Sequence, residues 1–189
     1  MSNVVIQVKG TILLDLVKQV RVAKGKNWND YLLPEDWSLV NGEILASQWY
    51  PDDFFYRLSY AVFKVSGESK MEACFAYGQL LAYKMAEVYK NIMVPGDPAT
   101  SIDRFLTRRQ SFFKGEHTDA GKNQIEKGDT RVMVRFYVDN KIRGQEVAAV
   151  MMQSILGAAH EIAKMNGANN VRSKMIDKRD CFDLIVEWD

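Results

Sequence analysis

The spacing of apolar residues changes from helical to alternating near residue 130, and this change constrains the fold more than any other feature. Before it, apolar side chains recur every three or four residues, which predicts five helices, over residues 11–23, 27–33, 51–66, 69–91 and 101–113. After it, every second residue of one segment is apolar, which predicts a half-buried strand: Val132, Val134, Phe136 and Val138. A helix over 144–165 and a β-hairpin over 171–188 follow. This order predicts an α+β fold, with an N-terminal helical half followed by a small antiparallel sheet of strand–helix–hairpin order.

Local residue choices define the ends and the packing of the predicted helices. Pro51 lies where a first helical residue would, and Asp52 and Asp53 follow in the first turn, where acidic side chains complement the helix dipole. Gly78 costs about 1 kcal/mol relative to alanine in the interior of its helix, so we expect a close helix crossing there. Two segments without a clear period are expected to be irregular, residues 35–49 and 114–129.

Length and composition set further bounds. The 189 residues suffice for one domain, which we expect to span residues 1–189. The formal charge of +1 argues against a nucleic-acid binder, and no apolar run approaches the roughly 20 residues of a membrane span. Two cysteines and a start without a signal-peptide pattern favour a reduced, cytoplasmic protein.

Motifs for catalysis and for metal binding are missing from the sequence. It contains no phosphate-binding loop, no dinucleotide fingerprint and no nucleophile elbow, and its cysteines and histidines lack zinc-ligand spacing. Adjacent Asp52 and Asp53 point about 100° apart on a helix, so they make a poor acid–base pair. His160 is expected at the boundary of a helix, with Glu161 and Lys164 beside it on the polar side, and His117 is expected in a polar loop. We therefore expect neither an enzyme nor a cofactor.

The segment from Arg104 to Lys114 is the most unusual in charge, since it holds four basic residues and no acid: Arg104, Arg108, Arg109 and Lys114. Residues 180–189 carry four acids, so the near-neutral total conceals local patches. The basic residues are either a solvated helix face or a partner-binding site.

Several motifs together resemble the H-NOX (heme-nitric-oxide/oxygen-binding) superfamily. They are the stretch Trp49-Tyr50-Pro51-Asp52-Asp53, which opens a helix, and Tyr77-Gly78 in the next helix. The ending from Cys181 to Trp188 looks like the last strand of the related vinyl-reductase-type ligand-binding domains. It also looks like an uncharacterised bacterial branch, and the transport-particle (TRAPP) core subunits share the superfold. The resemblance covers about residues 8–188.

This resemblance implies a ligand-binding sensor, and one without heme. The family's heme-ligating histidine falls at or near Leu106, and leucine cannot ligate iron. The family's Tyr-x-Ser-x-Arg, which holds the heme propionates, has a degraded counterpart in the segment from Tyr137 to Lys141. A small apolar or acyl-like ligand is the expected occupant, contacted by Phe105, Leu106, Tyr137 and Lys141. Signalling would pass to a protein partner or through a homodimer. A scaffold module without a ligand, and a divergent heme gas sensor, remain alternatives.

Overall fold

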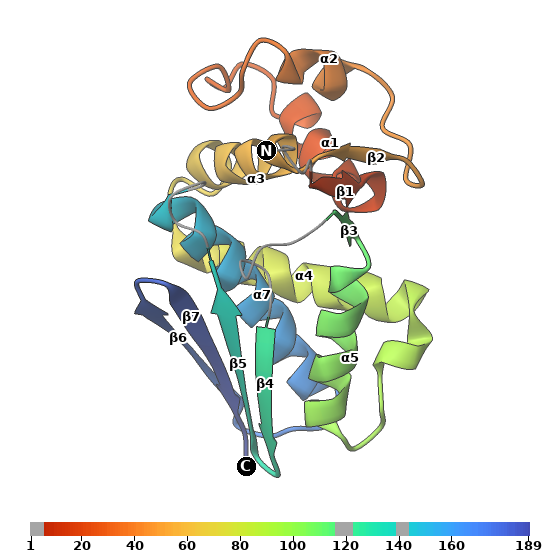
Figure 1. Cartoon of the computed structure of the whole chain (residues 1–189), viewed down its shortest axis with the longest axis vertical. Coiled ribbons are helices and arrows are strands. Elements are labelled where there is room, and N and C mark those ends of the chain that lie inside the picture. Colours follow the sequence, from red (N-terminus) through yellow and green to blue (C-terminus); the bar gives the residue numbers. More distant parts are fainter. Residues whose placement is uncertain (1–5, 116–122, 139–143) are drawn as a thin grey trace. The chain divides into compact units, whose positions relative to one another are not determined.

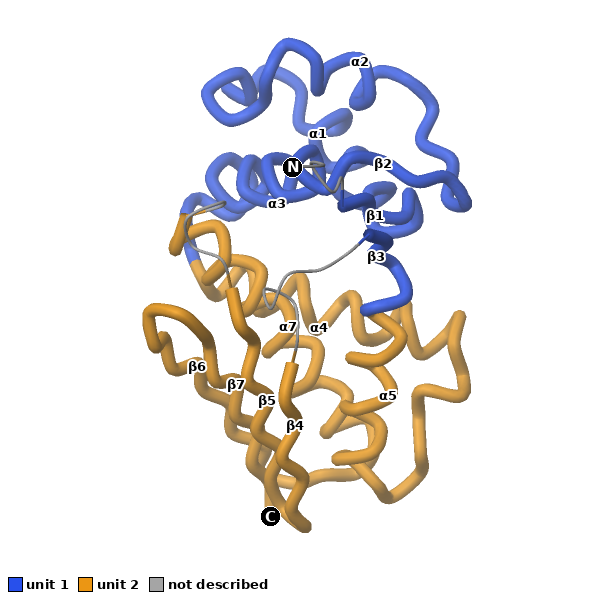
Figure 2. Tube along the Cα trace, in the orientation of Figure 1, with its two compact units in different colours: residues 1–70, 110–116 blue, residues 71–109, 117–189 orange. Residues whose placement is uncertain are grey.

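The computed structural model describes residues 6–115, 123–138 and 144–189, which form two compact units (Figure 1). Unit 1 comprises residues 1–70 and 110–116, and unit 2 comprises residues 71–109 and 117–189 (Figure 2). The chain therefore leaves unit 1 after Lys70 and returns to it briefly at residue 110.

Unit 1 packs three helices against a small three-stranded sheet. Its elements are β1 (Gln7–Lys9), the 3-10 turn η1 (Gly10–Ile12), α1 (Leu14–Val22), α2 (Asp36–Asn41), β2 (Trp49–Pro51), α3 (Asp52–Val65) and β3 (Phe113–Lys114). The strand order is β2-β1-β3, with both pairs antiparallel. Side chains from β1, from the three helices and from the residue before α1 are buried in its core, among them Val8, Leu13, Val17, Val40, Phe54 and Leu58. The predicted helix after Pro51 is confirmed as α3.

The predicted helix over 27–33 is wrong, because the structure has turns there and places α2 inside the segment expected to be irregular. Asp36 explains this shift. Its carboxylate is 1% exposed and accepts the backbone N–H of Leu33 at 2.9 Å. It also pairs with the Arg57 guanidinium of α3 at 2.8 and 2.7 Å. A contact 21 residues away in sequence thus fixes where α2 begins.

Unit 2 contains the α+β arrangement expected from the change of period. Its elements are α4 (Met71–Val88), the 3-10 turn η2 (Lys90–Ile92), α5 (Pro98–Gln110), β4 (Asn123–Gly128), β5 (Arg131–Tyr137), α7 (Gln145–Met165), β6 (Arg172–Lys178) and β7 (Cys181–Glu187). The sheet is antiparallel throughout, in the order β4-β5-β7-β6. The predicted strand, long helix and C-terminal hairpin are confirmed. The expectation of a loop over 114–129 is wrong for β4, a polar edge strand that pairs with β5 along six residues.

One face of the sheet of unit 2 packs against helices. The other, the solvent-facing face, is exposed along its edge strands, although Asp183 and Ile185 of the central strand β7 are buried on it. On the packed face, the alternating apolar residues of β5 and β7 are at most 4% exposed: Val132, Val134, Phe136, Phe182, Leu184 and Val186. From this face, Ser173 of β6 hydrogen-bonds with His160 of α7, and Lys127 of β4 donates to the carboxylate of Asp103 in α5. On the opposite face, alternate residues of the edge strands β4 and β6 are exposed.

The predicted close crossing at Gly78 is confirmed. A Cβ atom built on Gly78 of α4 would lie 1.9 Å from the backbone oxygen of Ser154 in α7. The contact is reciprocal, since a Cβ atom on Gly157 of α7 would lie 2.1 Å from the backbone oxygen of Phe75 in α4. Two glycines therefore allow the two longest helices of unit 2 to touch backbone to backbone.

Within the described residues, no helix combines the length and the apolar character needed to cross a bilayer.

Candidate functional site

Helix α5, which carries five of the predicted site residues, begins with a well-defined cap. Asp97 precedes the helix and its side chain accepts the N–H of Thr100 at 2.9 Å, which lowers the pKa of its carboxyl group. The hydroxyl of Ser101, a fully buried residue, accepts the N–H of Val94 and donates to the carbonyl of Asp97. These bonds fix the start of the helix and hence which side chains face the core.

Apart from Ser101 in its first turn, the inward face of α5 is apolar. Phe105 is 0% and Leu106 2% exposed, so both predicted ligand-contacting residues are buried in unit 2. Residues 98–110 include no histidine, cysteine, methionine or tyrosine. The residues of α5 therefore do not fit heme, because none of them supplies a nitrogen, sulfur or phenolate ligand for iron.

The outward face of α5 carries the predicted partner-binding arginines. The Arg104 guanidinium donates to the carbonyl of Asn91 at 2.9 Å, and that of Arg108 stacks 3.9 Å from the ring centre of Tyr89. Arg109, in the last turn, is half-buried. Lys114 belongs to unit 1, where its ammonium lies 5.9 Å from a Trp49 ring. The four basic residues are thus divided between the two units.

The C-terminal acids, by contrast, pair within their own sheet. Asp183 is 2% exposed and binds Arg135 of β5 at 2.7 and 3.0 Å. It also binds Lys178 of β6 at 2.5 Å. Glu187 lies 3.5 Å from Arg131, and Asp189 lies 3.1 Å from Arg172. These sheet cations neutralise much of the acidic segment locally.

The remaining predicted ligand contacts lie at the end of β5 or beyond it. Tyr137 is half-buried and pairs in register with Cys181. Because side chains alternate along a strand, it points to the face opposite the buried Phe136. Lys141 lies outside the described residues, as does His117. Phe105 and Leu106 thus adjoin on one helix, whereas Tyr137 belongs to the other face of the sheet.

His160 lies at a boundary, as expected, and its polar atoms are engaged in the fold. Its Nδ1 is 2.9 Å from the Ser173 hydroxyl, and its ring meets that of Phe75 edge-on at 5.2 Å. Burial, followed by the nearby Lys164 charge, lowers the pKa of its imidazole. The ring therefore favours the neutral state at pH 7 and joins α7 to β6.

Sequence reasoning missed one buried polar cluster between α4 and α7. Glu161 is 4% exposed, although its helical position suggested the polar side of α7. Its carboxylate accepts hydrogen bonds from Gln79 Nε2 at 2.7 Å and from the Tyr83 hydroxyl at 2.6 Å. These bonds outweigh the cost of burial and lower the pKa of Glu161. No spacing in the sequence signals this pairing, because the partners are about 80 residues apart.

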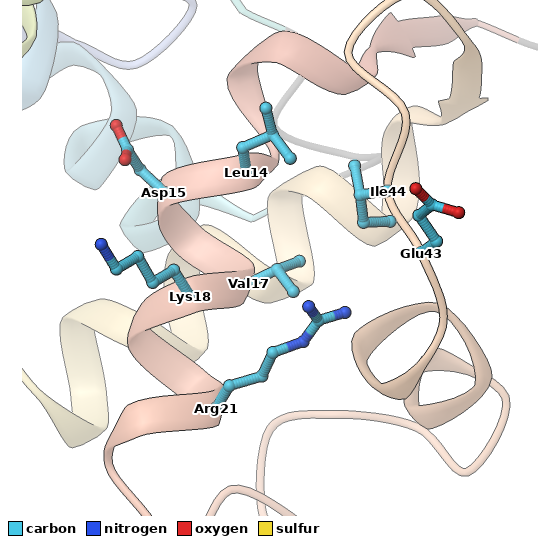
Figure 3. A pocket seen from close by; sticks show the side chains of 7 residues that line it. All are labelled: Leu14, Asp15, Val17, Lys18, Arg21, Glu43 and Ile44. Atoms are coloured by element: carbon cyan, nitrogen blue, oxygen red, sulfur yellow. The ribbon is translucent and has the colours of Figure 1, made fainter.

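A surface pocket of about 350 Å3 lies in unit 1, between α1 and the segment that follows α2 (Figure 3). Its floor is apolar and its rim bears both signs of charge. The guanidinium of Arg21 points across it and donates to the carbonyls of Val40 and Gly42. The pocket is lined by Leu14, Asp15, Val17, Lys18, Arg21, Glu43 and Ile44, none of which was a predicted ligand contact.

The part of the chain that the structure describes contains no group of metal-binding side chains, and its buried cysteine, Cys74, is a poor nucleophile. Within residues 6–115, 123–138 and 144–189, no three histidine, cysteine or acidic side chains group so as to hold a metal ion. Cys74 is buried, which raises the pKa of its thiol to about 11 and makes it a poor nucleophile. Asp52 is buried and Asp53 exposed, so the adjacent acids face different surroundings.

Comparison with known proteins finds similarity only at the level of structure. No family model and no curated protein matches the sequence. The Fe(II) unliganded H-NOX protein from K. algicida has a TM-score of 0.62 at 12% identity, over 96% of each chain. A point mutant of the T. tengcongensis H-NOX has a TM-score of 0.59 at 13% identity, over 95% of this chain and 97% of that one.

A third solved structure, used to probe heme distortion in the H-NOX family, has a TM-score of 0.59 at 14% identity. It matches over 95% of this chain and 94% of its own. These matches span both compact units. Because the sequence identity is so low, these matches establish only the fold. The roles of the site residues have to be argued from the side chains of this chain. The chain therefore has an H-NOX-like α+β fold.

Proposed function

We propose that this chain is a sensory module that binds a small apolar or acyl-like ligand without heme and signals through a protein partner. The fold is that of domains that include heme proteins, which supports a ligand-binding role. The absence of any iron ligand among residues 98–110, where Leu106 presents an aliphatic side chain to the core, is the observation that carries the proposal.

The choice of an apolar ligand follows from the same face of α5. Phe105 and Leu106 offer only carbon atoms, and burying apolar surface gives roughly 25 cal/mol per Å2. A ligand against them gains affinity from its hydrocarbon part, whereas a charged ligand would lose hydration without a partner. A polar head group would be held elsewhere. Lys141 is the proposed contact, because Tyr137 points to the other face of the sheet from the core that holds Phe105 and Leu106.

Two titrations test the ligand. Heme added to the purified protein should leave the Soret band of free heme unshifted. Dodecanoate should bind, detected as added mass above the 21.6 kDa chain by native mass spectrometry. Leu106→Phe should weaken dodecanoate binding by enlarging a side chain that the ligand is proposed to contact. Leu80→Phe is the matched control, because Leu80 is 50% exposed on α4. A protein-bound Soret band, or equal dodecanoate binding by both variants, would refute the proposal.

The basic residues of α5 are the proposed partner surface. Arg104 and Arg108 are exposed while their guanidinium groups are held by Asn91 and Tyr89, so the charges are presented in fixed positions. The double variant Arg108→Glu/Arg109→Glu should lose partners captured by the wild-type protein while dodecanoate binding is retained. Retained partners would exclude this surface. Lost partners in a protein that never binds dodecanoate would favour the scaffold alternative.

A further inference from the structure

Strand β6 forms one edge of the four-stranded sheet and pairs only with β7 (Figure 1). Its second edge has no strand beside it within the described sheet. The strand is seven residues long, and four of its residues share the solvent-facing side of the sheet, opposite Glu187, Ile185, Asp183 and Cys181 of β7. They are Arg172, Lys174, Ile176 and Lys178, all exposed.

On the solvent-facing side of β6 the exposed charges are positive, whereas its one acid, Asp177, lies on the other side of the strand and accepts a hydrogen bond from Gln145. Arg172 and Lys178 pair with acids, but the acid next to Lys178 is Asp183, which is only 2% exposed. Lys174 makes no ion pair or hydrogen bond with any residue that the structure describes. Ile176 lies between the two lysines and is 38% exposed, which is high for a large apolar side chain in a sheet. The edge therefore presents an apolar residue flanked by cations.

This charge pattern selects against a second copy of the same strand. Antiparallel self-pairing centred on Met175 would place Arg172 opposite Lys178 at both ends. Like charges directly opposite each other destabilise a strand pair, and lysines on edges are a known means of preventing sheet extension. An acidic strand reverses the sign of each of these contacts.

We propose that β6 is a docking edge for an acidic, extended segment of a protein partner, which joins the sheet as a fifth strand. Main-chain hydrogen bonds to the open edge provide affinity, and alternate side chains provide specificity. The segment would carry acids opposite Arg172, Lys174 and Lys178, and an apolar residue opposite Ile176. This surface differs from the α5 arginines, and the inference does not depend on the ligand.

The probe is the synthetic peptide Glu-Thr-Val-Val-Glu-Thr-Glu, which follows this pattern in the antiparallel direction. Binding is measured by amide chemical shifts in the full chain and should perturb β6 first. The same peptide with both valines replaced by proline keeps the charge but cannot form the ladder, so it should not bind. A peptide with lysine in place of each glutamate should also fail to bind.

Lys174→Glu tests the charge without touching a described ion pair. It should weaken the acidic peptide by about tenfold and strengthen the binding of a peptide in which only the glutamate opposite residue 174 is replaced by lysine. Lys24→Glu is the matched control, an exposed lysine in unit 1, and should change neither affinity. The proposal is overturned if the acidic peptide leaves β6 unperturbed at about 1 mM, or if the proline peptide binds equally well. Perturbation of β6 by an oligodeoxynucleotide or phosphatidylserine vesicles, but not by the peptide, would also overturn it.

Discussion

Replacing Gly78 with alanine should destabilise unit 2, although alanine is the better helix former. The new Cβ would lie 1.9 Å from the Ser154 oxygen, against at least 3.4 Å for an ordinary contact. The helices would therefore have to separate by about 1.5 Å. The higher helix propensity of alanine stabilises the fold by about 1 kcal/mol. Overpacking destabilises it by about 1–3 kcal/mol, and the separated helices also lose apolar contact with each other.

We expect a net loss of about 2 kcal/mol in the free energy of unfolding for Gly78→Ala, or about 4–8 °C in Tm. Chemical denaturation followed by circular dichroism measures it. Ala76→Gly is the control, because Ala76 is exposed on the same helix and reports propensity alone, with a loss of about 1 kcal/mol. A Gly78→Ala protein as stable as the wild type, or more so, would refute the reasoning.

The reciprocal contact adds a second test. Gly157→Ala should be destabilising for the same reason, since its Cβ would lie 2.1 Å from the Phe75 oxygen. One separation of α4 from α7 relieves both clashes, so the double variant should lose less than the sum of the two single losses. Additive losses would show that the two glycines act independently and that the crossing does not move as a unit.

Three other predictions follow from the charged and thiol groups. Arg135 and Lys178 hold the pKa of Asp183 down to about 2, below its ordinary 3.8, so its stabilising effect is present above about pH 4 and is lost as the pH falls through 2. Asp183→Asn should therefore remove part of the acid transition seen by circular dichroism, and an unchanged transition would exclude this role. Arg21→Met removes two bonds to the carbonyls at the end of α2 and should cost about 1–2 kcal/mol, measured as faster amide exchange in that segment. At pH 8, a thiol reagent should modify the half-buried Cys181 well before Cys74, whose pKa is raised to about 11; equal rates would contradict the burial argument.

Residue spacing alone was enough to predict the elements that bury a regular face. Residues 145–165 form α7 and residues 131–137 form β5, because the apolar periods of 3.6 and 2 match the faces that each element buries. Gly78 even indicated the helix crossing, since an interior glycine is costly unless a neighbour approaches it closely. The absence of an iron ligand in α5 was equally readable, because it depends only on residue types.

The predictions that failed concern features whose stability comes from residues far away in the sequence. Strand β4 has little apolar alternation and exists because β5 satisfies its backbone hydrogen bonds. Helix α2 begins where Asp36 meets Arg57. Glu161 was expected on a polar face and is buried, because Gln79 and Tyr83 of α4 reach its carboxylate. Each depends on a contact absent from the local sequence.

The sequence by itself therefore determined the α+β class, the main helices, the hairpin and the residue types of α5, which include no histidine, cysteine, methionine or tyrosine. The tertiary structure alone decided which strands form edges, which acids are buried, and that β6 presents cations and Ile176 on an open edge. The physical reason is the distance along the sequence between the residues that interact. Hydrophobic periodicity is a property of neighbouring residues, whereas strand pairing and the neutralisation of a buried charge require groups that only folding brings together.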